Sequence, residues 1–191
     1  MKRIIGLVFA IVCLGVTVSS QTPTALTTPT AERFSMVATL PRSITSKAWA
    51  EVRVSSYTSN AVARRFEDQL REGGEDGLVK ALENAEPIGD ATLSSRVGSF
   101  DLKLIRSRKT SSGRRIVAVS DRPIGFLEAY GANRSKEYKL GILVLDLKVK
   151  EGKEVGEGIL LYAARVKIKN GKLDIQYVGT DPIKLRNVRK E

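Results

Sequence analysis

The 191-residue chain contains no histidine. Histidine is the side chain whose ordinary pKa lets its charge change near neutral pH, and it is the base of Ser-His-Asp and Cys-His catalytic groups. Its absence excludes both catalytic groups, and it excludes metal sites and pH switches that rely on an imidazole. A reaction at this chain would have to use carboxylate, hydroxyl, amine or guanidinium groups.

Cysteine is nearly absent as well, because Cys13 is the only one. It lies inside the apolar run Ile4–Val16, which follows two basic residues and precedes short side chains at positions 18–20. This pattern predicts that residues 1–20 are a secretory signal peptide, with Cys13 as one of its apolar residues. A membrane anchor is the alternative, but the run is shorter than the roughly 20 residues that a spanning helix needs. We therefore expect a secreted or periplasmic protein that is not an integral membrane protein after cleavage, and that has no disulfide and no thiol chemistry.

Metal and phosphate chemistry also lack their usual residues. Without histidine or a mature cysteine, zinc would have to be bound by carboxylates alone, which is not its usual ligand set. A phosphate-binding loop needs glycines directly before a helix, whereas Gly152, Gly156 and Gly158 are predicted to lie in a hairpin loop. We therefore predict no metal and no cofactor.

Aromatic residues make up only 6% of the chain, while the net charge is +11. Such a charge favours anionic partners, namely lipid, envelope polysaccharide or nucleic acid, but a soluble, solvated surface is the favoured explanation. The basic residues are spread along the chain, and the few aromatic side chains give no strong nucleic-acid signal. Trp49 is the one tryptophan, and we predict that it is a core residue, with a ligand platform as the alternative.

The best-determined structure surrounds Asn170-Gly171, which separates two segments of alternating apolar and polar residues. Asn and Gly both accept the positive φ of a two-residue type I′ turn, so a β-hairpin is predicted. Turn geometry and alternation give the same register. The apolar pairs are Ile168 with Leu173, Val166 with Ile175 and Ala164 with Tyr177, and the polar pairs are Lys167 with Asp174 and Arg165 with Gln176.

A third strand, Leu140–Lys150, is predicted beside this hairpin. One of its faces carries Leu143, Leu145, Leu147 and Val149, and we expect this face to lie beside Leu160, Tyr162, Ala164 and Val166. The opposite face is partly apolar too, through Leu140, Ile142 and Val144. A strand that is apolar on both faces is covered on both faces. We therefore expect a helix, another sheet or a partner over the outer side.

Two short helices are predicted between Ser59 and Pro87. Ser59 or Asn60 can cap the first helix, Gly73-Gly74 ends it, and Pro87 stops the second. Each is too short to be stable alone, so both must dock, and the doubly apolar part of the sheet is the expected place.

These segments predict an α+β fold, a curved antiparallel meander of seven or eight strands that stays open or closes toward a barrel. The two-helix insertion follows the first strand, and Ile183–Val188 is predicted as a last edge strand. Residues 21–45 are expected to be a Thr/Pro-rich tether and lead-in, with a short strand within 32–43 as one option, and residues 46–191 a single domain.

Several segments resemble a family of small exported bacterial proteins of unknown function. They are residues 57–59, 73–81, 113–129, 133–135 and 182–189, and the resemblance extends from about Ser46 to Arg189. It implies an exported single-domain protein from a bacterium, and it implies no activity and no catalytic residues.

The sequence favours a non-enzymatic binding protein of the cell envelope or exterior. Its ligand would be an apolar or amphiphilic molecule between helices and sheet, or an acidic polymer on the basic surface. Arg122, Glu128 and Arg134 are the candidate ligand-binding residues. One alternative is a glycosidase-like hydrolase that uses Asp121 and Glu128, although acids beside Arg114, Arg122 or Arg134 more often form ion pairs. Another is a structural module that buries its outer apolar face against a partner.

Overall fold

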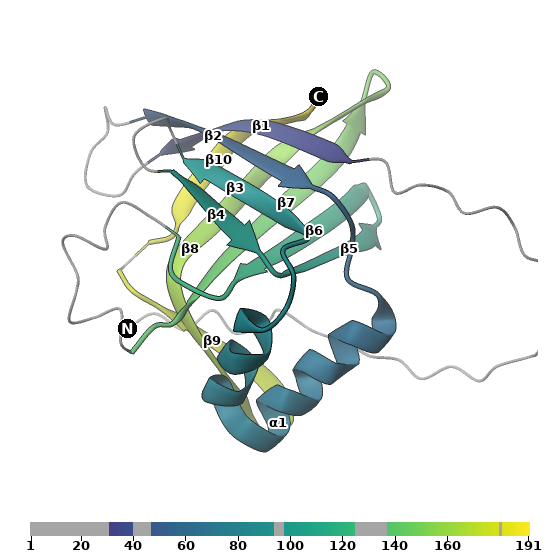
Figure 1. The fold of residues 1–191 in the computed structure, drawn as a ribbon. Coiled ribbons are helices and arrows are strands. Elements are labelled where there is room, and N and C mark those ends of the chain that lie inside the picture. The colour runs from purple at the N-terminus through teal and green to yellow at the C-terminus, as the bar shows by residue number, and fades with distance from the viewer. Residues whose placement is uncertain (1–30, 40–46, 94–97, 125–136, 180) are drawn as a thin grey trace, which may run out of the picture.

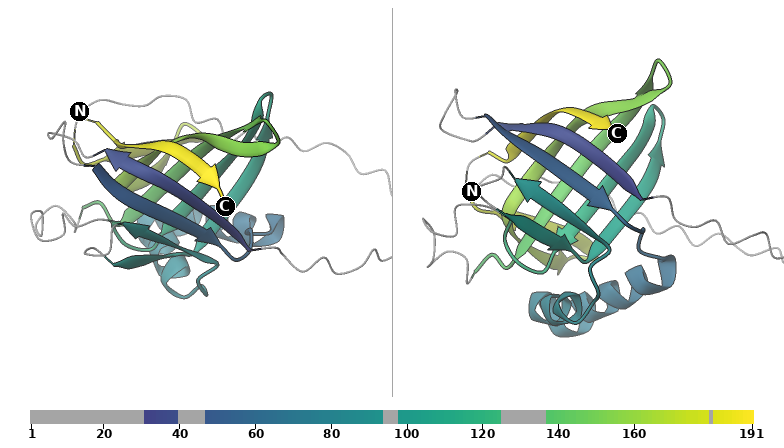
Figure 2. Two further views of the ribbon diagram at one scale, coloured as in Figure 1. Left: turned by 90° about the horizontal axis from the view of Figure 1, so that it is seen from above. Right: turned by 45° about the horizontal axis from the view of Figure 1, so that its top comes forward.

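The computed structural model describes residues 31–39, 47–93, 98–124, 137–179 and 181–191. In these residues, ten antiparallel strands form one strongly curved sheet that is nearly a barrel, and one helix packs outside it (Figures 1 and 2). The elements are β1 (Glu32–Thr39), β2 (Lys47–Val54), α1 (Asn60–Glu83), β3 (Gly89–Leu93), β4 (Ser99–Leu102), β5 (Leu104–Thr110), β6 (Gly113–Ser120), β7 (Leu140–Lys150), β8 (Lys153–Lys169), β9 (Lys172–Tyr177) and β10 (Ile183–Lys190).

The sheet curls because its two outermost strands, β4 and β5, are consecutive in the chain. The strand order is β4-β3-β2-β1-β10-β8-β7-β6-β5, and β9 pairs with the far part of β8. The outermost strands β4 and β5 are separated in sequence by Lys103 alone. The Lys103 N–H donates to the Val119 carbonyl of β6 at 2.9 Å, so the chain leaves β3 and joins β6 within one residue. This change of partner brings the two edges of the sheet together.

The predicted class, an antiparallel sheet that approaches a barrel, is confirmed, but the element count is wrong. The described residues form ten strands in place of seven or eight, and one helical element in place of two. The helix follows the second strand because β1 forms inside the segment predicted as tether and lead-in, where a short strand was an option. The predicted break between helices survives as non-helical backbone at Gly74, with φ 63° and ψ −156°.

The last strand is not the edge strand that proline and charge predicted. β10 lies between β1 and β8, with Lys184 opposite both Thr39 and Ile159. Curvature of the sheet, which no local pattern reveals, brings β1 alongside it. The charged side chains of β10 remain exposed on its outward face while Ile183, Leu185 and Val188 point inward.

The β8–β9 hairpin has the predicted register at every pair from Ala164–Tyr177 to Lys169–Lys172. Its two turn residues have the positive φ that a type I′ turn requires, 51° at Asn170 and 70° at Gly171.

Two apolar clusters lie on opposite sides of β7 and β8. The inner cluster fills the curved sheet and includes Leu143, Leu145 and Leu147. The outer cluster joins Leu140, Ile142 and Val144 to α1, so the predicted cover over the outer face is the helix. On the helix it comprises Phe66, Leu70, Leu78, Val79 and Leu82.

A β-bulge sets which residues of β8 face the helix. Leu140 pairs with Ala164 but Ile142 pairs with Leu161, so three residue steps on β8 match two on β7. The extra residue reverses the alternation, and Ala164 and Val166 join the outer cluster while Leu160 stays inside. The predicted common face of these three residues is therefore wrong.

One helix carboxylate helps to dock α1. Glu75, directly after the break at Gly74, accepts a hydrogen bond from the Val166 N–H of β8 at 3.1 Å. Burial raises the pKa of Glu75 despite this hydrogen bond. The break in the helix thus places a polar contact on a strand whose neighbouring residues pack against the same helix.

Gly156 and Gly158 lie within β8 and not in the predicted hairpin loop. Both fall in the inward row of β8, where Gly156 is opposite Leu147 and Val188. A Cβ at Gly156 would lie 1.9 Å from the backbone oxygen of Asp146. A glycine in a strand interior marks a bend or a close backbone approach, and here it permits both at the curve of the barrel.

We expect Gly156→Ala to lower the free energy of unfolding by about 2 kcal/mol or more, because the added methyl group forces β7 and β8 apart. Gly73→Ala is the matched control, since a Cβ there meets nothing within 4 Å. It should be neutral or stabilising by up to about 1 kcal/mol. Urea denaturation measures both variants, and equal stability of the two would contradict the close-approach explanation.

Candidate functional site

A cleft of about 360 Å³ lies between α1 and the wall of the barrel. Three short segments form it: the link from β2 into α1, the first turns of α1, and the link from α1 to β3 with Lys103 beside it. Its lining is mostly apolar. The lining residues are Tyr57, Thr58, Ser59, Val62, Phe66, Ala85, Glu86, Ile88 and Lys103.

Hydrogen bonds fix the link that begins α1. The Ser59 side chain accepts from the Val62 N–H at 3.3 Å and is the N-cap of the helix, as the sequence predicted. Buried Thr58 exchanges two bonds with Ile105 of β5, one through its backbone N–H and one through Oγ1. Arg106 donates to the Thr58 carbonyl and to Asn60 Oδ1. This side of the cleft is therefore held to the barrel.

Lys103 supplies the cationic group of the cleft. Its side chain is 9% exposed, and its Nζ donates to the Ala85 carbonyl at 2.9 Å and lies 3.9 Å from Asp101 Oδ2. The change of strand partner at Lys103 fixes its backbone. The side chain thus reaches from the barrel wall to the segment that follows α1.

Next to the cleft, charged side chains close one mouth of the barrel. This mouth network consists of Glu32, Tyr57, Arg114, Glu154 and Lys190. Arg114 bonds Glu154 at 2.6 Å, Glu32 at 3.1 Å and the Tyr57 hydroxyl at 3.0 Å. Lys190 Nζ lies 2.8 Å from Glu32 and 3.6 Å from Glu154, and Tyr57 donates to Glu32.

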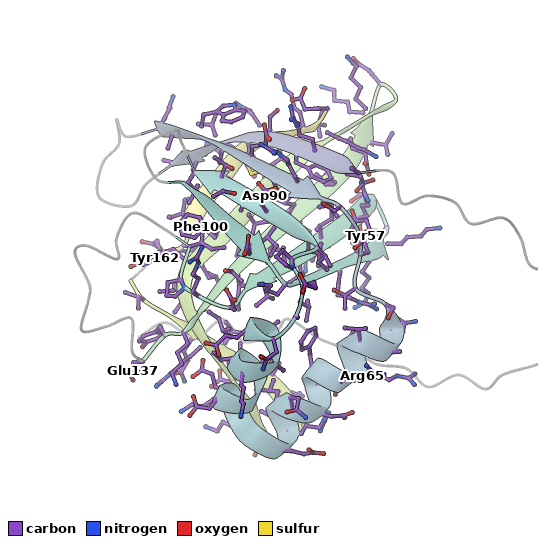
Figure 3. All side chains as sticks on the ribbon, viewed as in Figure 1. Tyr57, Arg65, Asp90, Phe100, Glu137 and Tyr162 are labelled. Atoms are coloured by element: carbon purple, nitrogen blue, oxygen red, sulfur yellow. The ribbon has the colours of Figure 1, made fainter. Side chains whose placement is uncertain are left out.

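The mouth network sits directly on the inner core. Glu32 continues the inward row of Phe34 and Met36 on β1, and the Arg114 guanidinium lies 5.8 Å from the centre of the Phe34 ring. Tyr57 belongs to both features, since its hydroxyl joins the network and the residue lines the cleft; Figure 3 shows it where the chain leaves the sheet for the helix.

Partners in this network determine its protonation. Burial alone would raise the pKa of Glu32, but hydrogen bonds from Arg114, Lys190 and Tyr57 outweigh it and lower the pKa to about 2. Burial and the bond to Glu32 raise the pKa of the Tyr57 phenol. Burial would lower the pKa of Arg114, but its carboxylate partners raise it.

These protonation states limit the chemistry of the network. A glycosidase needs one carboxyl that is protonated near neutral pH, and Glu32 is ionised there. Within the described ranges, no group of three or more acidic side chains could hold a metal ion. The side chains of the network are held by ion pairs and hydrogen bonds to one another at this mouth of the barrel.

Of the three sequence-predicted ligand residues, Arg122 lies within the part of the chain that the structure describes. Arg122 is not among the residues that line the cleft, and its guanidinium lies 5.7 Å from the centre of the Phe100 ring. Glu128 and Arg134 fall outside the described residues. Arg114, which the sequence suggested as an ion-pair partner for nearby acids, forms ion pairs with Glu32 and Glu154. Lys103 and Glu32 were missed because their surroundings come from segments distant in sequence. The cleft is lined by α1, its two links and Lys103, and not by the doubly apolar part of the sheet where the helices were expected to dock.

Trp49 is not the core residue that was predicted. It is 52% exposed on the outer face of β2, because Ala48, Ala50, Val52 and Val54 occupy the inward row of that strand. The inward positions opposite them are filled by larger side chains of β1, such as Phe34 and Met36.

No protein-family model, curated protein or solved structure matches this chain. In the part of the chain that the structure describes, no helix combines the length and the apolar character that a membrane crossing requires.

The mouth network generates a pH dependence. Because the folded pKa of Glu32 is below its ordinary value of 4.5, its contribution is complete above pH 4.5 and is lost as the pH falls toward 2. We expect Glu32→Gln to remove about 2 to 3 kcal/mol of stability at pH 7 and to flatten the loss below pH 4.5.

Urea denaturation at pH 7, 4.5, 3 and 2 measures this effect. Glu72→Gln, which removes one exposed carboxylate from α1, is the control and should keep the steep acid loss of the parent. Parallel pH profiles for Glu32→Gln and the parent protein would refute the assignment to Glu32.

Proposed function

We propose that this protein is an exported, non-enzymatic binding protein for a small anionic amphiphile. The apolar tail of the ligand occupies the cleft between α1 and the barrel, and its carboxylate binds the Lys103 ammonium. The observation that carries this proposal is a cationic group, 9% exposed, in a cleft whose other lining is mostly apolar.

The chemistry of Lys103 supports an anionic head group. An ammonium has three donors, and a buried charge is costly unless it is paired and hydrogen-bonded. Among the described residues its short hydrogen bond is to a neutral carbonyl, Ala85 O, and its acidic neighbour Asp101 is 3.9 Å away and half exposed. A ligand carboxylate would provide the close anionic partner.

The cleft also suits a short apolar tail. Val62 and Phe66 are one helical turn apart on α1 and face Ile88 across the cleft. Its volume of about 360 Å³ is at the lower end of the roughly 300 to 1,000 Å³ that small-molecule sites occupy. A fatty acid of medium length, such as decanoate, is the expected size of ligand.

The alternatives have less support. The hydrolase alternative requires Asp121 to act together with Glu128, and Glu128 lies outside the described residues. A structural module was expected to need a partner over the outer apolar face, and α1 already covers the outer cluster on β7 and β8.

Calorimetric titration of the purified protein with decanoate and with decanol tests the role of Lys103. We expect Lys103→Met to weaken decanoate binding about tenfold or more, because a charged hydrogen bond is lost, and to change decanol binding less than about twofold. Equal losses for both ligands, or no decanoate binding by the parent protein, would refute the proposal.

A second pair of variants places the tail in the cleft. Val62, which is 39% exposed, lines the cleft, whereas the neighbouring Ala61 is exposed and does not line it. We expect Val62→Glu to abolish decanoate binding and Ala61→Glu to retain it. The same titration measures both, and loss in both variants would show that charge on α1, and not occupation of the cleft, controls binding.

A further inference from the structure

The outer face of β10, β1 and β2 combines the chain's one tryptophan with many cations. These three strands are neighbours in the sheet, and their outer side forms one continuous surface seen from above (Figure 2, left). We call this surface the basic face; its cationic and aromatic members are Arg33, Lys47, Trp49, Arg53, Lys184, Arg186 and Arg189.

The register aligns Trp49 with cations in rows across the strands. Trp49 is opposite Val37, and Val37 is opposite Arg186 on the far side of β1. In the adjacent outward row, Lys47 and Lys184 flank Thr39 in the same way. Trp49 and Arg186 are two strands apart, which is roughly 10 Å at the usual strand spacing.

Beyond β10 the rows end in a groove. It has a volume of about 270 Å³, and Lys184 and Arg186 line one side while Glu157 and Ile159 of β8 line the other. An extended ligand that stacks on the indole and crosses β1 would therefore place its next groups against Lys184 and Arg186, at the side of this groove.

A buried carboxylate orients two further cations. Glu51, 7% exposed, lies between Arg33 and Arg53, whose Nε atoms are 3.4 and 2.7 Å from its Oε1. Both arginine side chains remain more than half exposed. Because Glu51 engages the Nε edge of each guanidinium, the terminal amino groups stay available to a ligand. Other acids near the face are Asp90 beside Arg53, Glu157 in the groove and Glu191 at Ser35.

We infer that the basic face binds a linear acidic polysaccharide, with one sugar ring stacked on Trp49 and neighbouring carboxylates held by Lys184 and Arg186. The apolar face of a pyranose ring matches the exposed indole on the outer side of β2. Arginine and lysine in fixed rows match a polymer that carries a carboxylate on each ring. The distance between Trp49 and Arg186 is about the span of a disaccharide.

Other polyanions fit this face less well. A single-stranded nucleic acid gains its binding energy by stacking successive bases, and the described part of the basic face offers one aromatic side chain. A membrane would require several apolar side chains around Trp49, whereas Val37 is the one apolar side chain among its described outward neighbours on β1 and β2.

Trp49 makes the test direct, because all tryptophan fluorescence of this chain comes from the basic face. We expect polygalacturonate to shift the emission of the full protein to shorter wavelength, in a saturable way that high salt weakens. Polyglutamate, which has carboxylates but no rings, should bind at least about tenfold more weakly, by the loss of ring stacking.

Variants locate the contact. We expect Trp49→Ala and the double variant Lys184→Ala/Arg186→Ala each to weaken polygalacturonate binding about tenfold or more. Binding by Trp49→Ala, which lacks the fluorophore, is measured by calorimetry. The double variant Lys167→Ala/Lys169→Ala removes the same charge from the exposed β8–β9 hairpin and should bind as the parent does. Circular dichroism of each variant confirms that its fold is retained.

Four results would overturn the inference. They are unchanged Trp49 emission with polygalacturonate, full binding by Trp49→Ala, equal affinity for polyglutamate, and equal losses in the two double variants. Tighter binding of oligothymidylate or of phosphatidylglycerol vesicles than of polygalacturonate would also overturn it, and would assign the face to nucleic acid or to membrane. None of these results depends on decanoate binding in the cleft.

Discussion

The whole structure depends on the burial of β7 and β8 on both faces. Their inner residues fill the curved sheet, and their outer residues receive α1. An antiparallel strand that is half exposed needs apolar residues only at alternate positions, but these two strands carry them at consecutive positions. Removing α1 would leave an apolar stripe in water, and opening the sheet would expose the larger cluster. The helix and the curvature of the sheet therefore both serve to bury the apolar side chains of β7 and β8.

The polar features follow from this arrangement. Where α1 leaves and rejoins the barrel wall, its two links cannot pack as closely as the strands do, and the cleft remains between them. Where the inward rows of β1, β6, β8 and β10 reach the end of the barrel, they change from apolar to charged residues, and opposite charges meet in the mouth network. Tyr57 lies at the junction of both, which couples the position of the helix to the closure of the barrel.

The sequence predicted those features of the fold that are determined by residues close to one another in the chain. The β8–β9 hairpin was predicted pair by pair, since the turn residues and the alternation lie within a few residues of one another. The helix break at Gly74 and the cap at Ser59 were local in the same way. Trp49 and β10 were misplaced because their surroundings depend on the curl of the sheet, which follows from the change of partner at Lys103. The same non-local cause gathers Glu32, Arg114 and Lys190, and no pattern along the chain could join them.

The place of β10 also bears on how the molecule forms. The segment Ile183–Lys190 fits between β1, which lies far earlier in the sequence, and β8. Until Ile183–Lys190 is available, β1 and β8 both present unpaired backbone, and the barrel wall is incomplete. Contacts of such long sequence separation make folding slow. Assembly of the wall thus waits for this segment, and a chain truncated before Ile183 would expose two unpaired strand edges.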